Sequence, residues 1–87
     1  RLFQNYPNPF NPVTKMKCLV PLSFVSDAVS IHIYDVTGRE VKSYPLGNLK
    51  AGIYSIEFDG EDLASGVYFY QLVTGSFSQT RKMVLIK

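Results

Sequence analysis

Apolar and polar residues alternate with a period of two along most of this chain, and the spacing of an amphipathic helix is nearly absent. In the run 14–20, three apolar side chains fall on one face of an extended strand, whereas Lys15 and Lys17 fall on the other. The runs 67–73 and 80–87 are apolar on both faces. The residues that share one face of each predicted strand are Met16, Cys18, Val20, Val29, Ile31, Ile33, Tyr54, Ile56, Phe58, Tyr68, Tyr70 and Leu72.

Glycine-containing turn sequences separate these runs, at 35–38, 48–52, 59–60 and 65–66. The pattern predicts six or seven short strands, of which 40–44 is the least regular. Because no segment is available as a crossover helix, an antiparallel arrangement is favoured over a parallel sheet. We therefore predict an all-β fold, an antiparallel β-sandwich, and a length of 87 residues allows only one such domain.

Residues 1–12 form a different kind of segment, a proline-rich lead-in, which we expect to pack on a sandwich made of residues 13–87. Prolines at 7, 9 and 12 remove backbone donors, so the segment is predicted to lie along a sheet without joining its ladder. Tyr6 and Phe10 could then cover one open end. A competing interpretation is a polyproline ligand for an aromatic groove. The chain starts at Arg1 rather than at a methionine, which suggests a piece of something longer.

Composition excludes several functional classes. The net charge of +2 comes from nine basic and seven acidic residues that form no stripe, so no nucleic-acid partner is expected. No apolar stretch approaches the roughly 18 residues of a membrane-spanning helix. No signal peptide is visible, and a single cysteine excludes an internal disulfide.

Candidate chemistry is sparse. His32 is predicted to lie on the outer face of its strand, and Cys18 on the inner face as a small apolar group. Because no acid, base and nucleophile converge, we predict that the chain is not an enzyme and needs no cofactor. Four acidic residues could offer oxygen ligands to calcium, but their spacing does not fit an EF-hand loop and favours a solvated turn. They are Glu57, Asp59, Glu61 and Asp62.

Four blocks of the sequence carry distinctive motifs: 2–12 with its Pro7-Asn8-Pro9, 33–41 with Tyr34, Asp35, Gly38 and Arg39, 63–72 with Gly66 and Tyr68, and 81–87. In these blocks the chain resembles the C-terminal sorting domain of type IX secretion substrates. The blocks occur in the family's order and cover essentially the whole chain. The immunoglobulin-like domain of the flagellar hook-capping protein is related, but it usually carries a longer insertion where only 61–64 lie here.

The resemblance implies an immunoglobulin-like sandwich that acts as an address label on a larger cargo protein. Such domains direct their cargo across the outer membrane to the cell surface, where it is attached or released. The implied partners are an outer-membrane secretion shuttle or translocon and a sortase-like surface protease. Two alternatives stay open: a structural immunoglobulin-like module, of flagellar-cap type or appended to an enzyme, and a carbohydrate-binding module that uses Tyr44 and Phe77.

The C-terminal run carries the prediction for partner recognition. In one interpretation it is an ordinary last strand whose cations prevent edge-to-edge association. In the other, a receptor extends this edge strand by β-augmentation. Arg39 could also contact a partner, whereas Asp35 and Gly38 are expected only to shape their turn. The candidate recognition residues are Arg39, Lys82, Met83, Val84, Leu85, Ile86 and Lys87.

Overall fold

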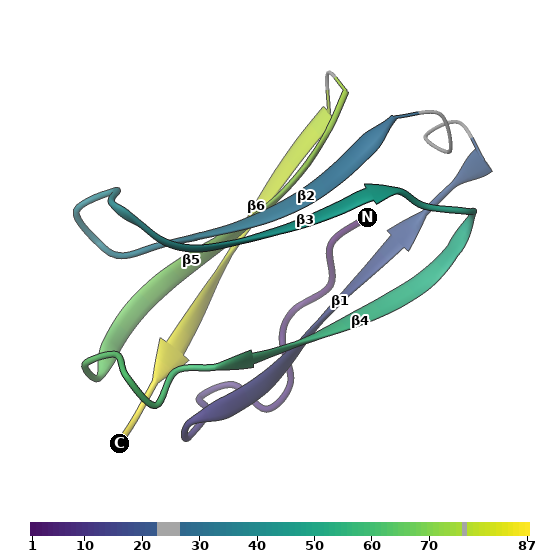
Figure 1. Cartoon of the computed structure of the whole chain (residues 1–87). Helices are drawn as coiled ribbons and strands as arrows, with labels where there is room; N and C mark the ends of the chain where they lie inside the picture. The colour runs from purple at the N-terminus through teal and green to yellow at the C-terminus, as the bar shows by residue number, and fades with distance from the viewer. Residues whose placement is uncertain (23–26, 76) are drawn as a thin grey trace.

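The structure is a computed structural model, and it describes residues 1–22, 27–75 and 77–87. Figure 1 shows its ribbon, in which strands are the regular elements. Among the described residues, there is no helix of the length and apolar character needed to cross a membrane. The strands are β1 (Val13–Val20), β2 (Ala28–Tyr34), β3 (Glu40–Asn48), β4 (Gly52–Asp59), β5 (Gly66–Thr74) and β6 (Phe77–Leu85).

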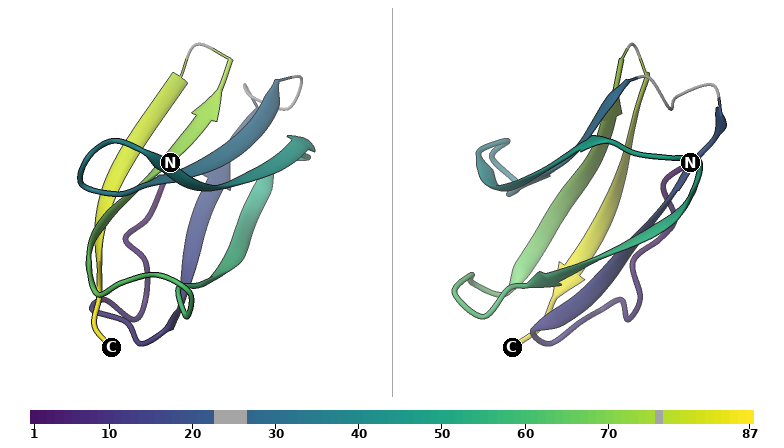
Figure 2. Two further views of the ribbon diagram at one scale, coloured as in Figure 1. Left: turned by 60° about the vertical axis from the view of Figure 1, so that its left-hand side comes forward. Right: turned by 45° about the vertical axis from the view of Figure 1, so that its right-hand side comes forward.

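The strands form two layers (Figure 2). One sheet contains β1 and β4, the other has the order β3-β2-β5-β6, and all neighbouring strands are antiparallel. The chain changes sheet between β1 and β2, between β3 and β4, and between β4 and β5. Repeated crossing between two antiparallel sheets is the arrangement of an immunoglobulin-like sandwich. The predicted fold class is therefore confirmed, with six strands, and the irregular run after residue 39 forms β3.

The hydrophobic core lies between the two sheets. Burial follows the predicted alternation most clearly in three strands: in β1 the apolar residues are buried while Lys15 and Lys17 are exposed, and β2 and β5 bury every second residue. The pattern in β3 is irregular. The two-residue period of a strand therefore decides which side chains enter the core. The buried core residues are Leu2, Phe10, Met16, Cys18, Val29, Ile31, Ile33, Phe58, Tyr68, Tyr70, Leu72, Met83 and Leu85.

The lead-in, residues 1–12, joins both sheets (Figure 1). Tyr6 and Lys15 of β1 exchange two backbone hydrogen bonds of 3.1 and 3.0 Å. Further along, Phe10 donates its N–H to the carbonyl of Val84 and accepts from the N–H of Ile86, both at 2.9 Å. The prediction that the lead-in stays out of the ladders is therefore wrong. Its prolines leave Tyr6 and Phe10 with the N–H groups that make these bonds.

The two aromatic residues of the lead-in have opposite environments. Phe10 is buried and meets Phe58 edge to face, with ring centroids 5.9 Å apart. Tyr6 is 81% exposed, so the expectation that its ring covers the sandwich is wrong, whereas the ring of Phe10 packs in the core. The packing around Phe10 also needs a glycine. A Cβ on Gly60 would lie 3.0 Å from Cδ2 of Leu85 and 3.5 Å from the Phe10 ring.

A small polar cluster fixes the first proline of the lead-in. The buried Asn5 amide donates to the hydroxyl of Thr14 at 3.0 Å and to the carbonyl of Pro7 at 3.1 Å. The Thr14 hydroxyl in turn donates to the same carbonyl at 2.8 Å. Since buried polar groups are costly unless paired, these bonds hold the irregular backbone in one conformation against β1.

Candidate functional site

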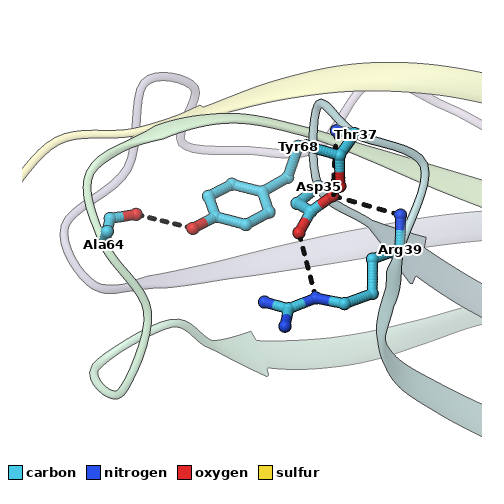
Figure 3. Close-up of polar contacts among 5 residues, drawn as sticks. All are labelled: Asp35, Thr37, Arg39, Ala64 and Tyr68. Atoms are coloured by element: carbon cyan, nitrogen blue, oxygen red, sulfur yellow. Dashed lines mark hydrogen bonds and ion pairs between the residues drawn. The ribbon is translucent and has the colours of Figure 1, made fainter.

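Asp35 organises the turn between β2 and β3 (Figure 3). Its Oδ1 accepts hydrogen bonds from the N–H and hydroxyl of Thr37, at 2.9 and 2.6 Å, and from the N–H of Arg39 at 3.1 Å. The Thr37 hydroxyl, followed by these backbone N–H groups and the Arg39 charge, lowers the pKa of the Asp35 carboxyl below its ordinary value. Gly38 has φ of 86°, which favours glycine.

Arg39 extends from this turn into solvent. Its Nε lies 3.3 Å from Oδ2 of Asp35, and 78% of its side chain is exposed. An ion pair this exposed contributes little to stability. The guanidinium is therefore held loosely by Asp35 and is accessible to a partner.

Tyr68 braces the loop before β5 (Figure 3). Its hydroxyl donates to the carbonyl of Ala64, four residues upstream, at 2.7 Å. A buried tyrosine near the start of a strand that bonds back in this way is the tyrosine corner of immunoglobulin-like folds. Gly66, between the two residues, has φ of 156°. Tyr68 and Gly66 therefore shape the fold at this loop.

The strands β2 and β3 are tied on their outer face by His32. Its Nδ1 lies 2.6 Å from Oε1 of Glu40, and its Nε2 lies 2.9 Å from Oγ of Ser30. The imidazole also stacks on Tyr34, with centroids 6.4 Å apart. His32 is on the outer face as predicted, but it is half-buried and bonded rather than simply solvated.

Side chains of the C-terminal run alternate between the core and solvent. Met83 and Leu85 are buried, so a partner cannot read their side chains in the folded domain. Lys82 is exposed, and Ile86 is 52% exposed. Lys87 donates from its backbone N–H to the Ser65 hydroxyl at 2.9 Å, and its ammonium to the Glu61 carbonyl.

The outer edge of β6, the last strand of its sheet, is occupied where the lead-in crosses it. Asn8 accepts the N–H of Val84 on Oδ1 at 3.0 Å, and Gln4 donates from Nε2 to the carbonyl of Lys82 at 2.7 Å. Together with the Phe10 bonds, these contacts engage the edge from Lys82 to Ile86. A receptor strand could add to this stretch only if the lead-in moved away.

Comparison with known proteins decides the family. The sequence model described as the secretion system C-terminal sorting domain matches residues 4–87. The chain belongs to this family. No curated protein matches the chain. Among solved structures, it is similar to a chain of PorZ from Porphyromonas gingivalis, with a TM-score of 0.70 and 21% identity over 97% of this chain.

The chain spans 11% of that PorZ chain, which is described as an essential bacterial surface component of the type-IX secretion system. At 21% identity, this similarity supports only the assignment of the fold of the present chain. The family supplies the function: this sorting domain is the C-terminal sorting signal of a cargo protein that the type IX system carries across the outer membrane, to the cell surface or the medium. Its role therefore involves the secretion machinery, and a sorting signal indicates a non-catalytic function.

Aromatic residues considered as a sugar-binding platform pack on the core of the sorting domain. Tyr44 and Phe77 are both partly buried against the core cluster. Burial, followed by the charge of Asp59, raises the pKa of Tyr44. Cys18 is fully buried, and desolvation raises its thiol pKa, which disfavours the reactive thiolate.

The acidic residues after β4 make local contacts. Asp59 accepts the N–H of Glu61 on Oδ1 at 2.9 Å, which is the geometry of a turn closed by its own aspartate. Within the described parts of the chain, no three His, Cys, Asp or Glu side chains gather as metal ligands would.

Proposed function

We propose that the sorting domain is recognised by an outer-membrane shuttle or translocon through the exposed side chains at its C-terminal end, together with Arg39. It acts without catalysis of its own. A sortase-like surface protease then separates it from the cargo or attaches the cargo to the surface. The recognition set comprises Arg39, Lys82, Val84, Ile86 and Lys87, with Met83 and Leu85 anchoring the strand that presents them.

The observation that supports this proposal is the alternation along the last strand. Met83 and Leu85 are buried, whereas Lys82 and Ile86 reach solvent on either side of them. An exposed aliphatic side chain between two lysines offers a partner both apolar area and charge. The Lys87 bonds to the loop at 61–65 hold the end of the chain against the domain.

Deleting residues 82–87 would not test recognition, because it removes two core residues and unfolds the sheet. Substitution of exposed residues avoids this problem. We would fuse residues 1–87 behind a periplasmic reporter in a host with type IX secretion, and compare Ile86→Ser with Val36→Ser. Val36 is also an exposed aliphatic residue, but it lies in the turn before β3.

Ile86→Ser is expected to leave the reporter in the periplasm, because it removes apolar contact area without touching the core. Val36→Ser should be exported normally, and the free energy of unfolding of both variants should stay within about 0.5 kcal/mol of the parent value. Normal export of Ile86→Ser, and of Lys82→Ala and Lys87→Ala, would contradict recognition at this end. Arg39→Lys, which keeps the charge but loses the planar fork, tests the turn separately.

A further inference from the structure

We propose that the sorting domain has a second docking surface, on the outer face of the sheet formed by the lead-in, β1 and β4, and that it binds an extended acidic segment of a partner protein. This face carries a groove of about 640 Å³. The volume is within the range of roughly 300–1,000 Å³ typical of ligand sites. The residues that decide its chemistry are Phe3, Tyr6, Lys15, Lys17 and Ile53. The proposal does not depend on recognition at the C-terminal end.

The cations of the groove form a row along β1. Lys15 and Lys17 are two residues apart on the exposed face of the strand, about 7 Å along its axis. Leu19 continues the same row, and it pairs with Ile53 in the neighbouring strand β4. An extended peptide has the same two-residue repeat, so its alternate side chains can match this row in register.

Apolar side chains border the row on both sides. Tyr6 of the lead-in is 81% exposed and pairs with Lys15 through the backbone, whereas Ile53 of β4 is 63% exposed. Exposed tyrosine and isoleucine beside a groove offer apolar area that an interface can bury. The ring of Phe3 makes a cation–π contact with Arg1, whose guanidinium carbon lies 4.7 Å from the ring centroid. Arg1 is therefore a third cation at the edge of the surface.

The charge of the groove favours an anionic occupant. Neither Lys15 nor Lys17 forms an ion pair with any carboxylate in the described parts of the chain. Glu57 is opposite Lys15 in the β1–β4 register, but it does not line the groove. The lining residues that the structure describes include two ammonium groups and no carboxylate, so an acidic segment would complement them.

Side chains rather than backbone must carry this recognition. On one side of β1, the backbone groups of Lys15 bond to Tyr6, and on the other side the strand pairs with β4. Strand addition to β1 is therefore blocked. Three cations interleaved with apolar groups are also too few for a polyanion, which needs a longer basic stripe. A short segment with two acidic residues and an apolar residue on one face fits the surface best.

The test uses the peptide Ser-Glu-Ser-Glu-Ser-Phe-Ser, whose glutamates and phenylalanine share one face when extended, titrated into ¹⁵N-labelled 1–87. We expect amide shifts at the groove, with Kd on the order of 0.1–1 mM that weakens as salt is added. The Lys15→Ala/Lys17→Ala double variant should bind about three- to tenfold more weakly. Tyr6→Ser, which leaves both cations in place, should also weaken binding because it removes the exposed ring.

Lys50→Ala is the matched control, since Lys50 is exposed but does not line the groove, and it should bind like the parent. A second control replaces both glutamates of the peptide by glutamine, which should abolish the salt dependence. Absence of groove shifts up to about 5 mM peptide would overturn the proposal. So would Lys15- and Lys17-dependent binding of a sulfated oligosaccharide without peptide binding, because the occupant would then be an anionic glycan.

Discussion

The turn at 35–39 and the C-terminal run at 82–87 both carry motifs of the sorting-domain family, yet they are held in different ways. The turn is closed by Asp35, whose partners all lie within four residues of it. The C-terminal run is held by residues at the other end of the chain: Asn8 is 76 positions from Val84, and Gln4 is 78 positions from Lys82. A change in the lead-in should therefore disturb the C-terminal end and leave the turn intact.

The largest effect expected from this comparison belongs to Phe10→Ala. Phe10 is buried against Phe58 and bonds through its backbone to β6, so its loss opens a cavity where the lead-in meets the C-terminal end. A destabilisation of about 3–5 kcal/mol is expected, which is a large part of the stability of a small domain. Urea unfolding measures it. Val36→Ala in the exposed turn should cost less than about 0.5 kcal/mol, and equal costs for the two variants would contradict the comparison.

A matched pair of tyrosine variants tests the same difference on a smaller scale. The hydroxyl of Tyr70 donates to the lead-in carbonyl of Phe3 at 2.7 Å, and that of Tyr68 donates to Ala64 at 2.7 Å. Each change to phenylalanine should cost about 1–2 kcal/mol, because a partly buried carbonyl loses its donor. Amide exchange should accelerate in the lead-in for Tyr70→Phe and in the 60–65 loop for Tyr68→Phe. The same exchange pattern in both variants would show that the lead-in is not separately tied.

Asn8→Ala should have a smaller effect. It removes the Oδ1 that accepts the N–H of Val84 at an exposed position, so we expect a loss of about 0.5–1.5 kcal/mol. Exchange of the Val84 amide should increase, while the amides of Thr37 and Arg39 keep their protection. If the Val84 amide exchanged at the parent rate, the Asn8 contact would not hold the edge of β6 in solution.

The sequence pattern predicts which face of a strand enters the core in some strands and not in others. The alternation at Met16 and Cys18 is local, so it gave the right face of β1. The run after residue 80 is apolar on both faces, and the sequence pattern does not decide that Met83 and Leu85, rather than Val84 and Ile86, enter the core.

Contacts between residues far apart in the chain could not be predicted from the sequence for a different reason. The lead-in has no periodicity that could indicate where it lies, so its bonds to β6 and the outward direction of Tyr6 were missed. His32 meets Glu40 because the β2–β3 register shifts between Ile33 and Tyr34, and a shift of this kind leaves no simple pattern in the chain. The Asp35 turn, in contrast, could be predicted because its bonds lie within one short sequence block.

The smallest effect is a pH dependence confined to the turn. The folded-state pKa of Asp35 is lowered, mainly by the Thr37 hydroxyl. Its carboxylate therefore contributes stability that is fully present above the unfolded-state pKa of about 3.9 and is lost as the pH falls through the lower folded-state value.

Asp35→Asn keeps an oxygen acceptor and removes the charge. In urea unfolding between about pH 2.5 and 6, the parent should exceed the variant by a small, constant margin above about pH 5, and this margin should shrink as the solution becomes more acidic. All other acids titrate in both proteins, so the difference isolates Asp35; a margin that stays constant or grows toward low pH would mean that the charge does not hold the turn.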